Sequence, residues 1–177
     1  MKPKKCAVCR TTFEPRTTTQ KACSWQCAVE FTDKKKSLLQ AKQKREGLEK
    51  LKSLTDHLND AQVPVNAYVR IRDEGKPCIS CQNPIKNGSG EAGHYRSRKA
   101  ASQLRFDLDN IHLQCHHCNV HLSSNAIEYR INLVKKIGAE RVEALENNNQ
   151  EKRWTIEEAK DIKQKYTLLL KELKKHE

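Results

Sequence analysis

Two cysteine pairs, Cys78-Ile79-Ser80-Cys81 and Cys115-His116-His117-Cys118, decide how this chain folds. Cysteines separated by two residues form a knuckle that presents both sulfurs to one metal ion, and two knuckles supply the four ligands that zinc prefers. The 33 residues between the pairs exceed what a plain zinc ribbon needs. We therefore expect a structural zinc site at Cys78, Cys81, Cys115 and Cys118, with a hairpin between the pairs that carries other functional residues.

The segment between the pairs predicts two strands followed by a helix. Glu91-Ala92-Gly93-His94-Tyr95-Arg96 is expected to run as a strand, and Leu104-Arg105-Phe106-Asp107 as a second strand or extended return. Asp109-Asn110-Ile111-His112-Leu113 leads into the second pair, and Asn119 begins a helix that continues through His121. The zinc site would hold this order of strand, strand and helix at its base.

Length and composition indicate one or two small domains in a chain of 177 residues. Aromatic residues make up 5% of the chain and charged residues 32%, so we expect no large conventional core. Eight cysteines without an N-terminal apolar signal segment favour a reducing compartment, in which paired cysteines bind metal. No apolar run approaches the roughly 20 residues of a membrane span. We expect a cytoplasmic protein without a membrane partner.

The net charge of +12 is concentrated in the first third of the chain, where residues 1–60 carry 14 Lys and Arg against 7 Asp and Glu. A basic region of this kind is typical of proteins that contact phosphate backbones. The alternative is that the charge serves solubility alone. Because zinc modules occur in the same chain, we expect DNA as the partner.

The first region, residues 1–27, contains a second cysteine cluster with the spacing Cys6-x2-Cys9-x13-Cys23-x3-Cys27. This pattern predicts a four-cysteine zinc ribbon. A site closed by four thiolates leaves no open coordination position, so we assign it a structural role and no chemistry.

The second region, residues 28–75, is predicted to be a basic helical arm or linker. Leu48, Leu51 and Leu58 recur at helical spacing over residues 28–60, after a run rich in lysine. Pro64 is expected to interrupt the helix. The alternation in residues 66–73 resembles a strand, but we favour a second short helix that Asn66 caps and that ends near Gly75. The arm could be a solvated connector, could contact the DNA backbone or could wrap around a partner subunit.

The last two regions are the strand–strand–helix core at residues 76–125 and a helical region at residues 126–177. A helix after Asn125 should place Ile127, Ile131 and Val134 on one face and stop near Gly138, and a short helix follows over 139–146. Thr155-Ile156-Glu157-Glu158 matches a capping box. After it, a stripe recurs at helical spacing: Ala159, Ile162, Tyr166, Leu169 and Leu173. The stripe could pack on the core or join two chains in a homodimer.

The motifs between the knuckles resemble those of the ββα-metal (HNH) nucleases. These enzymes place a general-base His on the first strand, an Asn in the returning segment and a metal ligand near the start of the helix. Their zinc-held members, including phage endonuclease VII, have that His between two cysteine pairs and an Asn directly after the last Cys, as in Cys118-Asn119. The chain is therefore expected to be an α+β protein with a ββα-metal core, an N-terminal zinc ribbon and flanking helices.

A closer resemblance is to the phage NinG (Rap) recombination family. It rests on Cys-x2-Cys, on Gly-His-Tyr-Arg-Ser-Arg at 93–98 and on Cys-His-His-Cys-Asn at 115–119. The resemblance extends to the N-terminal cysteine cluster and to residues 70–75. It implies a structure-specific endonuclease that acts on branched DNA recombination intermediates, such as Holliday junctions or D-loops, with the recombination machinery as a possible partner.

Phosphodiester hydrolysis assigns a role to each residue of this pattern. His94 would take a proton from water, and Asn110 would hold the His94 ring through its side-chain carbonyl. Asn119 would ligate a catalytic Mg²⁺ or Mn²⁺ through its amide oxygen. Arg96 and Arg98 would grip the scissile phosphate or its neighbour. The expected cofactors are thus two structural Zn²⁺ and one catalytic divalent cation.

One position departs from the pattern of the nucleases. The residue before the base is often Asp or His and supplies a metal ligand, but here it is Gly93. The replacement ligand could come from Glu91, Asp109, His117 or His121, or phosphate and water could hold the cation. This departure favours an alternative, a zinc-dependent DNA-binding accessory of recombination or transcription without hydrolysis. A protein-interaction adaptor built on two zinc modules is a further alternative.

Overall fold

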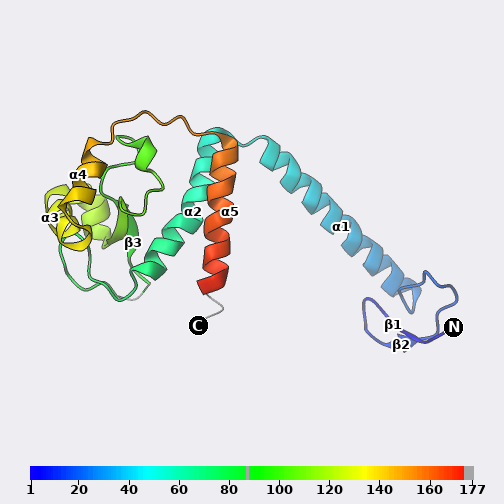
Figure 1. The fold of residues 1–177 in the computed structure, drawn as a ribbon. Coiled ribbons are helices and arrows are strands. Elements are labelled where there is room, and N and C mark those ends of the chain that lie inside the picture. Colours follow the sequence, from blue (N-terminus) through cyan, green and yellow to red (C-terminus); the bar gives the residue numbers. More distant parts are fainter. Residues whose placement is uncertain (87, 174–177) are drawn as a thin grey trace. The chain divides into compact units, whose positions relative to one another are not determined.

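The computed structural model describes residues 1–86 and 88–173, which form two compact units, Met1–Lys52 and Ser53–Glu177 (Figure 1). The described chain is mostly helical, with two small antiparallel sheets of two strands each, so the predicted α+β class is confirmed. None of its described helices is long and apolar enough to cross a membrane.

The first unit consists of the N-terminal cysteine cluster and one long helix. Strands β1 (Lys4–Lys5) and β2 (Thr12–Phe13) pair antiparallel. Helix α1 (Trp25–Lys50) begins after Ser24, whose hydroxyl accepts a hydrogen bond from the Cys27 backbone N–H. No residue of α1 is buried, because its leucines are interspersed with lysines around the helix. The helix predicted over 28–60 is therefore confirmed in part: α1 is helical and solvated, as a connector would be, but it ends at Lys50.

Helix α2 (Leu54–Arg72) opens the second unit with a capping box, in which the Ser53 hydroxyl accepts from Asp56 N–H and the Asp56 carboxylate accepts from Ser53 N–H. The unit boundary at Lys52 and Ser53 thus lies inside the 28–75 arm expected from sequence. The predicted interruption at Pro64 is wrong, because α2 continues through it to Arg72. Burial of the flanking Ala61 and Val65 offsets the hydrogen bond that proline cannot make. The helix predicted over 66–73 is confirmed as the end of α2.

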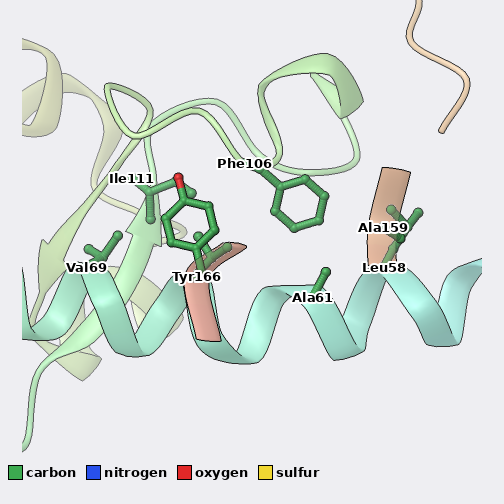
Figure 2. Close-up of a cluster of buried hydrophobic side chains, with 8 residues drawn as sticks. Leu58, Ala61, Val69, Phe106, Ile111, Ala159 and Tyr166 are labelled. Atoms are coloured by element: carbon green, nitrogen blue, oxygen red, sulfur yellow. The ribbon is translucent and has the colours of Figure 1, made fainter. Parts of the chain in front are cut away.

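One hydrophobic core lies where α2, α5 (Ile156–Leu173) and the second sheet meet (Figure 2). Leu58, Ala61 and Val69 of α2 face Ala159 and Tyr166 of α5 in this core, and Phe106 and Ile111 cover them. The capping box at Thr155 and Glu158 is confirmed by reciprocal hydrogen bonds of 2.9 and 3.2 Å. Of the two fates predicted for the α5 stripe, packing on its own chain is the one found. Residues 174–177 at the end of the 126–177 region lie outside the described residues.

A second core is formed by α3 (Ala126–Ile137) and α4 (Ala139–Asn147), on the other side of the sheet from α2 and α5 (Figure 1). Tyr129 and Leu133 are its fully buried residues from α3. Ile127 and Ile131 are exposed instead, so of the predicted apolar face of α3 only Val134 packs against this core. The helix is turned so that the Tyr129 hydroxyl donates a 3.1 Å hydrogen bond to the Gly93 carbonyl.

The sheet of the second unit is a hairpin of β3 (Glu91–His94) and β4 (Ile111–Gln114), paired antiparallel with Gly93 opposite His112. The predicted extended return at 104–107 is wrong, since the chain forms a short 3-10 turn, η1 (Ser102–Leu104), that buries Leu104. After β4, a short helix η2 (His117–His121) begins two residues before Asn119, and the helix expected from Asn119 to His121 falls within it.

A buried carboxylate joins the helices of the second unit to β4. Asp73, directly after α2, is fully buried and accepts hydrogen bonds from Arg72 Nη2 (2.7 Å), Lys76 Nζ (2.9 Å), Lys136 Nζ (3.2 Å) and Leu113 N–H (3.3 Å). Burial alone would raise the pKa of Asp73, but the neighbouring His112, Arg72 and Lys76 outweigh it and hold the pKa well below its ordinary value. Asp73 is therefore ionised in the folded protein.

We expect Asp73→Asn to destabilise the zinc-loaded protein by about 3 kcal/mol at pH 7, because it removes the buried charge that Arg72, Lys76 and Lys136 share. A depressed folded-state pKa contributes stability above the ordinary aspartate value of about 4, and this contribution is lost as the pH falls below it. The loss should therefore be constant between about pH 6 and pH 8. Urea unfolding would measure it.

Asp109→Asn serves as the control, since Asp109 pairs with the exposed Arg141 and should contribute less than about 1 kcal/mol. Equal effects of the two substitutions would contradict the importance of the Asp73 network.

Candidate functional site

Each unit contains a cluster of four cysteines whose sulfurs all lie within 4.8 Å of one another. Cys9 and Cys23 Sγ are 3.4 Å apart, Cys23 and Cys27 Sγ 3.8 Å, and Cys81 and Cys115 Sγ 3.9 Å. Tetrahedral zinc with Zn–S bonds of about 2.3 Å places its sulfurs about 3.8 Å apart, whereas a disulfide needs about 2.0 Å. Both predicted cysteine sets are therefore consistent with two zinc sites.

The cysteines of the second cluster differ in their pKa values. Burial raises the pKa of Cys78, but hydrogen bonds from the backbone of Cys115 and Cys81 outweigh it and lower the pKa. Burial, together with the neighbouring Cys115 and Cys81 thiols, raises the pKa of Cys118 to about 12. Four thiolates can coexist at this spacing only when a bound cation neutralises them.

The second cluster closes the open end of the hairpin. The first knuckle is fastened to β4 by a 3.0 Å hydrogen bond from Ile79 N–H to the Leu113 carbonyl, and the second knuckle follows β4 directly. A metal held by both knuckles thus fixes η2 against β3.

A polar hollow of about 370 Å³ lies beside the hairpin. It is lined by residues from α2, from β3 and the loop after it, and from the region of η2: Asn66, Arg70, Glu91, Ala92, His94, Ser97, Arg98, Asn119 and Ser124. The structure therefore brings His94 and Asn119 together, as the sequence predicted. It adds Asn66 and Arg70 from α2, to which sequence reasoning assigned no role, although Arg70 belongs to the 70–75 stretch of the family resemblance.

One hydrogen bond fixes the tautomer of His94. His94 Nε2 lies 3.0 Å from the Arg105 carbonyl, which can only accept, so Nε2 carries the proton and Nδ1 keeps a free lone pair. Burial lowers the pKa of His94 to about 4, with a contribution from the charges of Arg98 and Arg105. The ring is therefore neutral at pH 7 and can accept a proton at Nδ1.

Asn110 does not hold the His94 ring, contrary to prediction. Its Oδ1 accepts from Arg96 N–H at 2.8 Å, and its Nδ2 donates to the carbonyls of Arg96 (3.0 Å) and Leu104 (3.1 Å). The buried Asn110 side chain thus shapes the 96–104 loop, and the backbone carbonyl of Arg105 orients the ring instead. Sequence could not identify this partner because every residue has a carbonyl.

Arg96 is also placed differently from the prediction. Its guanidinium donates to the carbonyls of Leu145 (2.8 Å), Glu146 (3.1 Å) and Asn148 (2.9 Å), at the C-terminus of α4 where the helix dipole favours a cation. Arg98 and Arg70 line the hollow instead, both exposed and without a hydrogen bond or ion pair to the described residues. They are the two guanidinium groups at this site that can bind an anion.

Of the four residues considered as replacement ligands, Glu91 is the one that lies beside Asn119. Asn119 Nδ2 donates to Glu91 Oε2 at 2.6 Å, and His116 Nδ1 lies 2.6 Å from Glu91 Oε1. These two contacts lower the pKa of Glu91, so it is a carboxylate at neutral pH. The other candidates, Asp109, His117 and His121, do not line the hollow.

These features define a small α+β protein in which a four-cysteine cluster that could hold a metal closes a hairpin beside a His-, Asn- and Arg-lined hollow. Over residues 1–177 the chain matches the family described as Bacteriophage Lambda NinG protein, and it belongs to that family.

Among its relatives, the protein ninG of Escherichia phage 933W is 39% identical over 97% of this chain and 94% of its own. The protein ninG of Escherichia phage lambda is 47% identical over 70% of this chain and 60% of its own. No solved structure matches this chain.

We expect Cys118→Ser to remove one of two zinc ions per chain and to unfold the second unit. Structural zinc contributes roughly 10–16 kcal/mol of apparent binding free energy in small modules. Cys9→Ser should also remove one zinc but leave the second unit folded, because the two units are separately compact. Zinc content by atomic absorption and limited proteolysis would measure both effects. Unfolding of the second unit in Cys9→Ser would contradict this independence.

Proposed function

We propose that this protein is a metal-dependent, structure-specific DNA endonuclease that acts on branched recombination intermediates of the Holliday junction or D-loop type. The observation that carries the proposal is the neutral His94, with Nδ1 free, in one hollow with Asn119, Glu91 and two unpaired arginines. The zinc-closed hairpin and η2 supply the ββα order that this chemistry uses in the nucleases that the sequence resembles.

His94 acts as the general base in this proposal. Its Nδ1 takes a proton from a water molecule, the water oxygen bonds to phosphorus, and the bond from phosphorus to a sugar oxygen breaks. Solvent then protonates the leaving oxygen. The negative phosphodiester in the hollow offsets the nearby arginines and raises the pKa of His94 from about 4 toward the working pH.

A divalent cation, Mg²⁺ or Mn²⁺, would neutralise the charge that develops on the phosphate oxygens. Asn119 is the residue to hold it, with Glu91 beside it. Arg98 and Arg70 bind the scissile phosphate or its neighbour through N–H donors.

Two further features support a DNA substrate. Residues 1–60 carry the largest excess of positive charge in the chain, and α1 exposes its lysines to solvent along its length. This first unit would contact the backbone of a DNA arm. Branched DNA, the recombination machinery and the host cytoplasm are the corresponding partners and location. A homodimer that cuts two strands would need a surface other than the α5 stripe, which packs against α2.

The second candidate function is a non-catalytic DNA-binding accessory of recombination or transcription. Gly93 favours it, because the metal-ligating side chain that the nucleases often carry at this position is absent. The two functions differ in one measurable property, cleavage of a junction that both would bind.

Wild-type protein should cut a labelled four-way junction, but not linear duplex, in the presence of Mg²⁺ or Mn²⁺. His94→Ala should lower the cleavage rate by about 10²–10⁴-fold, because a general base typically contributes that much. Zinc content and junction affinity should be unchanged. His121→Ala is the matched control, since His121 is exposed outside the hollow and should cut at the wild-type rate. Tight junction binding without cutting by the wild type would favour the accessory function.

Substitutions of the arginines distinguish residues that contact phosphate from a residue that stabilises the fold. Arg98→Ala and Arg70→Ala should each weaken junction binding and reduce the slope of log affinity against log salt by about 1. Arg96→Ala should leave that slope unchanged and lower thermal stability, because it removes the contacts at the end of α4. Fluorescence anisotropy at several salt concentrations would measure the slopes. An unchanged slope in both Arg98→Ala and Arg70→Ala would exclude these residues as phosphate ligands.

A further inference from the structure

The space above Gly93 is occupied by an amide from the neighbouring strand. A Cβ atom at position 93 would lie 1.8 Å from Gln114 Oε1 and 2.6 Å from Gln114 Cδ. No side chain fits there without displacing Gln114. The glycine is therefore required by a neighbouring side chain, which sits where the metal-ligating side chain would otherwise be.

The side-chain amide oxygens of Gln114 and Asn119 both lie near this point. Gln114 Nε2 donates to Ser80 Oγ and to the Ser124 carbonyl, both at 2.7 Å, so Oε1 is turned toward Gly93. Asn119 Nδ2 donates to Glu91 Oε2 at 2.6 Å, and Asn119 Oδ1 lies 3.1 Å from the Cβ position at Gly93. The nitrogen of each amide is thus used, and the two oxygens face the same space.

Gln114 Oε1 lacks a hydrogen-bond partner among the described residues, although Gln114 is fully buried. A buried oxygen without a partner costs free energy comparable to its lost hydrogen bond. Because amide oxygens only accept, the partner must be a cation or a proton donor such as water. The adjacent Glu91 carboxylate and the open hollow on the Asn119 side favour a cation.

We propose that Gln114 Oε1 and Asn119 Oδ1 together form a divalent-cation site at Gly93, with Gln114 supplying from β4 the oxygen that position 93 lacks. Neutral amide oxygens suit a hard cation such as Mg²⁺ or Mn²⁺. Glu91 positions Asn119 and adds negative charge beside the site. This inference rests on the proposed function only in identifying the cation with the one that cleavage would use.

The test measures Mn²⁺ binding to the zinc-loaded full chain without DNA. The electron paramagnetic resonance signal of unbound Mn²⁺ reports how much of the ion is bound. Gly93→Ala displaces the Gln114 amide and Gln114→Ala removes it, so each should weaken Mn²⁺ binding by about 10- to 100-fold. The double variant Gly93→Asp with Gln114→Ala places a carboxylate in the vacated space and should restore binding. Recovery by combining two damaging substitutions is not expected from a merely structural role.

Gly90→Ala is the matched control, because it also crowds a β4 side chain, with its Cβ 2.5 Å from Leu113 Cδ1, but lies away from the two amide oxygens. Its Mn²⁺ affinity should equal that of the wild type. Zinc content and thermal unfolding would verify that each variant is folded. Should the Gly93 and Gln114 variants fail to fold, Asn119→Ala, at a partly exposed position, should show the same loss of Mn²⁺ binding.

Absence of Mn²⁺ binding by the wild type at millimolar concentration would overturn the inference and leave the two oxygens to a buried water. Unchanged affinity in folded Gly93→Ala or Asn119→Ala would also overturn it. Mn²⁺ binding with the expected losses but without DNA cleavage would keep this inference and reject the nuclease. DNA cleavage by the wild type, together with Mn²⁺ affinities that the substitutions leave unchanged, would support the nuclease and overturn this inference.

Discussion

The four cysteines Cys78, Cys81, Cys115 and Cys118, whose sulfurs converge at a spacing that fits one zinc ion, are the constraint on which the second unit depends. Strands β3 and β4 have four residues each, and an isolated two-stranded hairpin of this size is marginal in water. The thiolates repel one another unless a metal neutralises them, so metal binding and closure of the hairpin occur together. His94 and Gln114 lie between the two knuckles, and Asn119 follows the last thiol, so their positions all depend on that closure.

The Asp73 network fixes the helices against this hairpin. Asp73 follows α2 directly and binds the backbone of β4 through Leu113 N–H and α3 through Lys136 Nζ. Because α2 continues through Pro64 and is anchored at this end, its register sets where Asn66 and Arg70 enter the hollow. The Asp73 ion cluster therefore helps to position the α2 residues that line the candidate site.

The candidate site gains its properties from groups that are neighbours in sequence but have opposite environments. Arg96 binds the carbonyl end of α4, whereas Arg98, two residues later, remains unpaired at the hollow. Gly93 lies against a buried amide, whereas the adjacent His94 is held by a backbone carbonyl with its second nitrogen free. Burial supplies the neutral imidazole, and the arginines supply an attraction for phosphate. The proposed hydrolysis requires both conditions in one place.

The sequence by itself determined the two four-cysteine sets, the α+β class, the strand carrying His94 and the capping box of α5. Each of these follows from local spacing, because ligand geometry and helix capping operate over a few residues. Only the tertiary structure decided the partners of Asn110 and Arg96, the buried face of α3 and the continuation of α2 through Pro64. Backbone carbonyls such as that of Arg105 have no signal in the sequence, and contacts such as that of Arg96 with the Asn148 carbonyl join residues 52 positions apart. The tertiary structure also decided that Gln114 occupies the space above Gly93. Gln114 lies on the neighbouring strand, so this contact is visible only once the two strands are paired.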